Sequence, residues 1–415
     1  MNSYEQILGK SQQASYILGG AKPTASFGSS KIGSTTQVYA ARQGTSYATQ
    51  QLVQVQPLSS VPANIFESGG FVDYIVRTPP AFVMEDLFIE LKIKNNGLNP
   101  ALMPMVWFLA EKVEVFAGTT LLSTEEAFSS YLKTMLCTIP SQLEVVAPYY
   151  NINPTTYLEA GNLAANTTKS YFLPVDQILK NLVPSLINEE IRIRVHYVAK
   201  SSFDETADLS LVSSVLWLEG RIMNPTDHQI TAQNYLSGSF IHRYFEGRIS
   251  KHPQNITASS ELTSVLSSFN GSFIGFFVYG QNQNPRGIEK HTPLLSFIDT
   301  LHMTDATSRI LYGGSTTSRE LLKYRASTEF AGSRLLSLKD ITPISVSPSI
   351  WLDWTTGSVS GATYLEAKGE KLVINTEPSF FGGSVSYGNN NNVCVLGIQV
   401  SAFKLTSAGK VVALR

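Results

Sequence analysis

The sequence predicts an all-β protein built from two tandem jelly-roll β-sandwiches (a double jelly roll), with short inserted helices and an N-terminal arm. Runs of alternating apolar and polar residues recur along the chain, and this period of two is the signature of half-buried strands. The runs are short and separated by long connections rich in Gly, Pro and Asn, as in antiparallel sandwiches. One helix is expected at the same relative place in each half, which favours jelly rolls over immunoglobulin-like domains.

Length and composition agree with a self-packing β-protein. The chain has 415 residues, enough for two domains with separate cores. Charged residues make up only 15% of it, below the roughly 25% typical of soluble domains. This indicates either a surface covered by neighbouring molecules or a β-rich secreted protein. The net charge of −1 gives no electrostatic case for nucleic-acid binding, so no sequence-specific nucleic-acid partner is expected.

Two cysteines, Cys137 and Cys394, are too few for a disulfide framework or a four-cysteine zinc site. Both have apolar neighbours and are predicted to be buried. The N-terminus shows no apolar core of a signal peptide, and no stretch reaches the roughly 20 apolar residues of a membrane span. We therefore expect a cytosol-like compartment.

Residues 1–66 form a distinct segment rich in Gln, Ser, Gly and Ala. They carry too few large apolar side chains to order themselves. Two interpretations remain open, an unattached terminus or an arm that orders on a partner or an inner surface. The arm is mildly basic, and its cations are candidate inner-surface contacts: Lys10, Lys22, Lys31 and Arg42.

The first jelly roll is predicted over residues 67–225. Its clearest strand runs from Phe82 to Lys94 and ends at a turn, Asn95-Asn96-Gly97. A helix is predicted after it, capped by Ser123 or Thr124, and a long loop then extends to Lys169. Further strands are predicted at residues 71–77, 106–116, 171–173, 191–198 and 209–222.

The second jelly roll and a C-terminal tail are predicted over residues 226–415, after a turn at Asn224-Pro225-Thr226-Asp227. A second capped helix is expected from Thr317 or Ser318. The strands of this half are predicted at residues 240–249, 271–279, 294–299, 310–312, 350–354, 372–376 and 393–404.

A search for chemistry assigns no catalytic, cofactor-binding or metal-ligating residue. The six histidines form neither His-x-His nor His-Glu-x-x-His, which argues against a tandem cupin enzyme. No Gly-x-Ser-x-Gly elbow is present, and Gly9-Lys10-Ser11 lacks the first glycine of a phosphate loop. We expect no enzyme and no cofactor. Distant carboxylates that the fold brings together, as in a glycosidase, stay open.

Trp351 and Trp354 offer a stacking surface for sugars or bases. Residues three apart on a strand face opposite sides, so at least one of the two is expected in the core.

The order of an arm, a β-run ending in Asn95-Asn96, a strand-to-helix step and a second copy of that order resembles a known family. It is similar to the double jelly-roll major capsid proteins of tailless icosahedral viruses, especially those of membrane-containing bacteriophages. Local likeness is greatest in Phe88–Asn96 and in Cys394–Thr406. The likeness covers the whole chain in element order but rests on no diagnostic motif.

The resemblance implies a structural major capsid protein. Three chains would form a homotrimer with a pseudo-hexameric outline, because each chain supplies two similar domains. The trimers would tile an icosahedral shell and contact neighbouring capsomers and minor capsid or penton proteins. It also implies an arm on the inner side, near an internal lipid membrane if one is present, and assembly in the cytoplasm of the host.

A second hypothesis is a tandem β-sandwich that binds carbohydrate or a receptor, motivated by loops that carry Tyr and Trp. A third is a spike or adhesin module, which would need a shaft or anchor sequence that the chain does not show.

Overall fold

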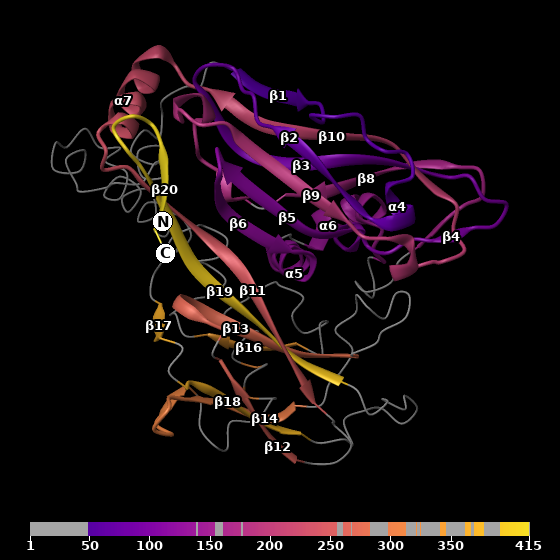
Figure 1. Ribbon diagram of the computed structural model, residues 1–415, viewed down its shortest axis with the longest axis vertical. Coiled ribbons are helices and arrows are strands. Elements are labelled where there is room, and N and C mark those ends of the chain that lie inside the picture. The colour runs from indigo at the N-terminus through magenta and orange to yellow at the C-terminus, as the bar shows by residue number, and fades with distance from the viewer. Residues whose placement is uncertain are drawn as a thin grey trace, which may run out of the picture.

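The structure is a computed structural model (Figure 1). It describes residues 49–137, 140–153, 161–175, 177–254, 260–266, 268–282, 298–312, 321, 324, 341–345, 362–366, 369–376 and 391–414. The four cations assigned to the arm, the tryptophans at 351 and 354 and most of the second predicted helix lie outside these residues.

The first half contains two four-stranded antiparallel sheets, with strand orders β1-β10-β3-β8 and β2-β9-β5-β6. A short pair, β4 (Ala101–Leu102) and β7 (Asn162–Leu163), lies apart from them. The eight sandwich strands are β1 (Thr49–Val55), β2 (Gly70–Ile75), β3 (Phe82–Asn95), β5 (Ala110–Ala117), β6 (Thr120–Glu126), β8 (Thr168–Pro174), β9 (Ile191–Tyr197) and β10 (Leu209–Ile222).

The second half also contains two antiparallel sheets, with orders β11-β19-β13-β16 and β12-β18-β14-β15. Two added strands, β17 (Thr363–Glu366) and β20 (Val411–Leu414), pair with β13 and β19. The sandwich strands are β11 (Ile241–Gln254), β12 (Ser260–Val265), β13 (Asn270–Asn282), β14 (Ile298–Thr304), β15 (Ile310–Tyr312), β16 (Ile341–Ser345), β18 (Lys371–Thr376) and β19 (Asn391–Leu405).

The two halves share one topology. When the sandwich strands of each half are numbered one to eight in chain order, both halves have one sheet ordered 1-8-3-6 and one ordered 2-7-4-5. Two four-stranded antiparallel sheets connected in this order make a jelly roll. The predicted double jelly roll is thus confirmed, with one jelly roll above the other in Figure 1.

Strand β3 shows why this sequence forms a half-buried strand. Leu87, Ile89, Leu91 and Ile93 are fully buried, and the residues between them point outward. This alternation keeps one face of the sheet against the core, as the sequence predicts. Asn95 ends the strand, where its side-chain carbonyl accepts a hydrogen bond from the Gly97 amide at 2.9 Å.

The sheet containing β13 and β19 is buried on both faces. On β13, Phe276 and Val278 belong to the interior of the second sandwich, whereas Phe277 and Tyr279 belong to the core that continues into the first jelly roll. Each face therefore contacts a different apolar layer, which explains why the strand is a continuous apolar run.

Among the described residues, helices lie mainly in the connections of the first half. Helix α5 (Ala127–Cys137) begins after β6, so Ser123 is not a helix cap but a buried residue of that strand. The long loop expected up to Lys169 contains a second helix, α6 (Pro140–Tyr150). The other helices are α4 (Ile65–Ser68), α7 (Pro225–Leu236) and the 3-10 turns η1 (Val106–Leu109), η2 (Gln177–Leu179), η3 (Pro184–Leu186) and η4 (Lys200–Ser202).

Several predicted boundaries are wrong. Thr49–Val55, assigned to the arm of residues 1–66, is strand β1 and pairs along β10. The predicted strand at 106–116 begins as the 3-10 turn η1. The turn expected at residue 224 is the N-terminus of α7, where the Asn224 side chain accepts from the Asp227 amide at 2.9 Å. Part of the expected C-terminal tail is strand β20.

Candidate functional site: the junction and the outer surfaces

The junction between the two jelly rolls is closely packed and partly polar. The Tyr244 hydroxyl on β11 donates to the Leu122 carbonyl on β6, and the Thr124 amide donates to the Glu246 carboxylate at 3.3 Å. On α5, the Phe128 ring lies 4.2 Å from the Tyr279 ring of β13, centroid to centroid. These apolar contacts and directed hydrogen bonds together fix the orientation of one jelly roll relative to the other.

A glycine permits the closest approach at this junction. A Cβ atom on Gly247 of β11 would lie 1.8 Å from Ser129 Oγ and 2.6 Å from Ser129 Cβ on α5. Any larger residue at 247 would push the helix away from the strand. The spacing of the two jelly rolls therefore depends on this position.

The C-terminal hairpin adds a second set of contacts between the halves. The Asn188 amide donates to the Gly409 carbonyl at 2.9 Å, and the Val411 amide donates to Glu189 Oε2 at 2.6 Å. Gly409 has a φ of +73°, which an L side chain rarely adopts. The turn before β20 thereby ties the second jelly roll to the loop before β9.

The outer face of the sheet β2-β9-β5-β6 carries paired charges over aromatic rings. The Arg194 guanidinium contacts the Asp73 carboxylate through two bonds of 2.7 and 2.9 Å and lies 4.2 Å from the centre of the Phe71 ring. Arg192 lies over the Phe116 ring at 4.7 Å. Arg and aromatic side chains held in this way are typical of protein–protein interfaces.

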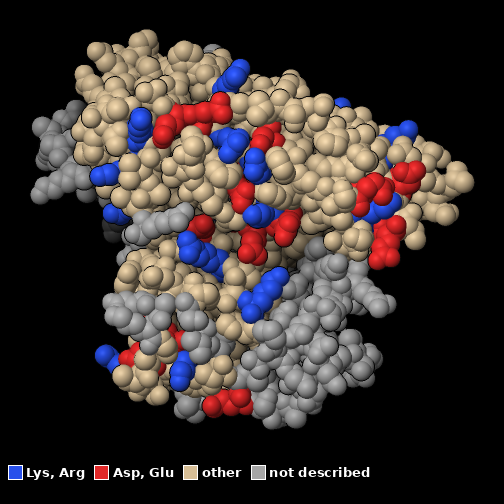
Figure 2. Space-filling view, viewed as in Figure 1, with Lys and Arg blue, Asp and Glu red and all other residues tan. Residues whose placement is uncertain are grey.

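Charges on the visible face of the molecule are mixed in sign and sparse. Figure 2 shows blue and red groups interspersed near the middle of the molecule, with broad uncharged areas around them. A surface of this kind favours lateral packing over the binding of a polyanion.

Two histidines of the described residues, His242 and His196, each contact one protein group. His242 is buried, and its Nε2 donates to the Ile178 carbonyl at 2.7 Å. Burial lowers the pKa of His242 to about 4, so the ring is neutral at ordinary pH. His196 lies on the surface beside Glu114, at 2.8 Å. Among the residues described, no cluster of His, Cys, Asp and Glu could hold a metal ion.

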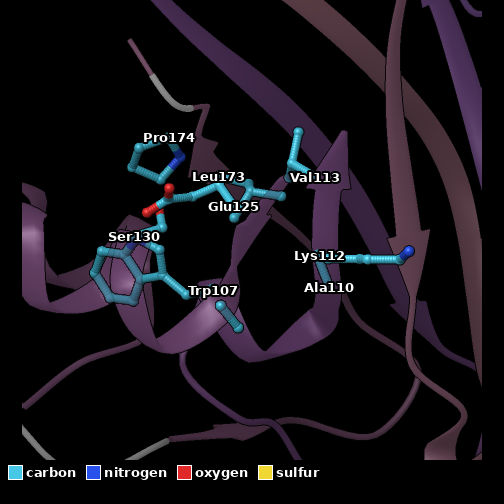
Figure 3. Close-up of a pocket in the computed structure, with 9 residues that line it drawn as sticks. Trp107, Ala110, Lys112, Val113, Glu125, Ser130, Leu173 and Pro174 are labelled. Atoms are coloured by element: carbon cyan, nitrogen blue, oxygen red, sulfur yellow. The ribbon is translucent and has the colours of Figure 1, made fainter. Parts of the chain in front are cut away.

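One hollow lies beside the junction, between β5, β6, β8 and α5 (Figure 3). Its lining includes Trp107, Glu125 and Ser130, with the Glu125 carboxylate pointing toward Pro174 and Ser130. The volume is about 10 Å³, which is the space of one water molecule. The hollow is too small for a substrate.

A larger cleft lies between α6 and the outer face of the sheet β1-β10-β3-β8. Its volume is about 250 Å³, and Phe88, Phe172 and Tyr149 supply aromatic rings to it. Sequence reasoning missed this cleft because α6 was predicted as a loop.

The structure also bears on the predictions for the two cysteines and for membrane-spanning segments. Cys394 is buried, as predicted, whereas the Cys137 side chain lies outside the described part. Within that part no helix is long and apolar enough to cross a membrane.

No family model and no curated protein sequence matches the chain. Solved structures do. VP54 of PBCV-1, fitted into a reconstruction of the virophage Sputnik, aligns with a TM-score of 0.65 over 90% of this chain and 98% of that chain, at 10% identity. The Faustovirus major capsid protein gives 0.61 over 86% and 90%, at 8% identity. The mavirus major capsid protein gives 0.51 over 89% and 91%, at 12% identity.

These matches span both halves of the chain and nearly the whole of each neighbour. The chain thus has the double jelly-roll fold of viral major capsid proteins, as its resemblance to that family implied. At such low identity the likeness is one of fold.

Proposed function

We propose that this chain is a structural major capsid protein, which assembles as a homotrimer and tiles an icosahedral shell. The observation that carries the proposal is the repetition of one strand order in both halves, joined by a sheet that is buried on both faces. Two equivalent domains in fixed orientation let three chains present six similar units.

The composition supports the same role. A chain with 15% charged residues and a net charge of −1 can be packed closely against copies of itself with little repulsion. The cation–aromatic face of β2-β9-β5-β6 is a surface suited to such contacts.

The trimers contact neighbouring capsomers and minor capsid or penton proteins in the virion, after assembly in the host cytoplasm. We assign Lys10, Lys22, Lys31 and Arg42 of the arm to the inner surface, where anionic lipid headgroups of an internal membrane would attract them weakly.

We further propose that the protein is not an enzyme. Two polar groups of the junction, the Tyr244 hydroxyl and the Glu246 carboxylate, are engaged by main-chain groups of β6, and the hollow beside the junction holds one water at most. A carbohydrate- or receptor-binding protein that acts as a monomer is not favoured, because the similar solved structures are capsid proteins.

Native mass spectrometry of the purified chain tests the proposal. The expected species is three times the 45.4 kDa chain. A protein that stays monomeric at high concentration contradicts it. Deletion of residues 1–48 should leave the trimer intact and impair shell assembly, and normal shells from that truncation would remove the role given to the arm.

A further inference from the structure

The cleft between α6 and the sheet β1-β10-β3-β8 has the composition of a small-ligand site. Three elements line it: β3, β8 and α6. Its volume of about 250 Å³ is many times the ~10–15 Å³ that one water needs and is close to the lower limit of roughly 300 Å³ for small-molecule sites. A single ring of saccharide size matches this space.

Aromatic rings form the apolar part of the lining. The Phe172 ring stands edge-on to Phe88 at 5.7 Å and to Tyr149 at 5.3 Å, centroid to centroid. Tyr149 is 46% exposed, so an incoming molecule reaches it from solvent. Because the edge-to-face contact of Phe88 and Phe172 holds both rings in position, the cleft is already formed before a ligand binds.

One carboxylate and two phenols supply the polar part. Asp86 Oδ1 accepts the Leu87 amide at 2.9 Å, and the residue is exposed. Burial and the nearby Asp86 carboxylate raise the pKa of Tyr150 to about 12, so its hydroxyl stays protonated at neutral pH. A ligand in the cleft thus meets both an acceptor and hydroxyl groups.

The charges near Asp86 select a neutral ligand. Burial raises the pKa of Asp86, and smaller opposing effects come from the bond to the Leu87 amide and from Lys180 and Lys133, which carry the opposite charge, whereas Glu219 carries the same charge. Two anions and two cations leave little net attraction for an ionic ligand. A wholly apolar occupant would also bind poorly, because covering the Asp86 carboxylate without a donor is costly.

We propose that this cleft binds the pyranose ring of a neutral saccharide. The apolar C–H face of the ring packs on Phe88, Phe172 and Tyr149, and its hydroxyls donate to Asp86. The inference does not rest on the capsid role, because the binding is a property of the folded chain. It would give a shell built from this chain an affinity for glycans.

Saturation-transfer NMR with methyl glucoside, methyl galactoside, methyl mannoside and N-acetylglucosamine tests the proposal on the intact protein. At least one pyranoside should bind. Asp86→Asn should weaken that binding by about 10-fold or more, as expected for the loss of a charged hydrogen-bond acceptor. Tyr149→Ala should weaken it by about 5-fold, through the lost ring contact.

Tyr364→Ala is the matched control, because Tyr364 is a 62% exposed tyrosine in the second jelly roll. It should bind as the unchanged protein does. Cyclohexanol, with a ring of similar size and one hydroxyl, should bind more weakly than the best pyranoside.

The proposal is overturned if no pyranoside binds, if cyclohexanol binds as tightly as the sugars, or if both cleft variants keep full binding. The mass of the assembly is measured on the same samples. A trimer without sugar binding removes the cleft proposal alone, and sugar binding by a monomer removes the capsid proposal alone.

Discussion

The two jelly rolls share a strand order but differ in how their equivalent sheets are buried. The sheet of β3 has one apolar face and one face that mixes charged and aromatic residues, whereas the sheet of β13 and β19 is apolar on both. The second jelly roll therefore contributes one sheet to two cores. The same strand order thus gives a sheet with one exposed face in the first half and a sheet between two apolar cores in the second.

The largest effects should distinguish these two kinds of sheet. On β19 the neighbours Val395 and Leu396 point into different cores. Leu396→Ala should lower the free energy of unfolding by about 2–5 kcal/mol, and Val395→Ala by about 2 kcal/mol. On β3, Leu91→Ala should cost a similar amount, but Lys92→Ala should change stability by less than ~0.5 kcal/mol. Urea titration measures all four, and a harmless Val395→Ala would contradict the two-sided burial.

The next effect is a pH dependence at the junction. The folded protein holds His242 neutral down to about pH 4. The unfolded chain protonates a histidine near pH 6.5, so stability should fall as the pH drops from about 6.5 to 4, by up to about 3 kcal/mol. Stability above pH 6.5 should not depend on this group. His242→Phe should flatten the profile in that window, and an unchanged slope in the variant would exclude His242 as the cause.

A smaller effect is expected from the close approach of α5 and β11. Gly247→Ala places a methyl group against Ser129 and should cost about 1–3 kcal/mol. Ser129→Gly removes both contacting atoms and should restore much of that loss in the double variant. Thermal unfolding of the four proteins gives the coupling energy, and strictly additive losses would show that the two residues do not meet.

The smallest effect concerns the C-terminal hairpin. Gly409→Ala must adopt a positive φ and approaches Asn188 to 3.0 Å, so we expect a loss of about 1 kcal/mol. Gly97→Ala, at a turn within the first jelly roll that has no positive φ, is the control. Hydrogen exchange of the Asn188 and Val411 amides should increase only in the Gly409 variant. Unchanged exchange there would show that the hairpin does not hold the halves together.

Period-two patterns were enough to predict most of the strands. Strands β3 and β10 are predictable from the sequence alone, because alternating apolar and polar residues indicate a strand with one buried face. Strand β1 was missed because its sequence, Thr-Gln-Gln-Leu-Val-Gln-Val, is as polar as the arm before it. It is held in place mainly by pairing with β10, whose paired residues lie 161 or more positions away, and local sequence does not encode this contact.

Other errors have local causes. The pair Glu125-Glu126 looks like the first turn of a helix, but tertiary contact with β11 keeps Glu125 in a buried strand. Helix α6 contains Pro148 and two tyrosines, a composition typical of loops, and the cleft beside it was therefore invisible in the sequence. Cleft residues come from three separate segments, residues 86–88, 146–150 and 172–174, and only the fold brings them together.

Negative-stain imaging of the purified protein distinguishes a pseudo-hexameric trimer from every other assembly. We expect particles of three chains with a hexagonal outline, because the six jelly rolls share one topology and each pair is held rigidly at its junction. Particles of one chain, or trimers with three separated lobes in place of six equivalent ones, would contradict it.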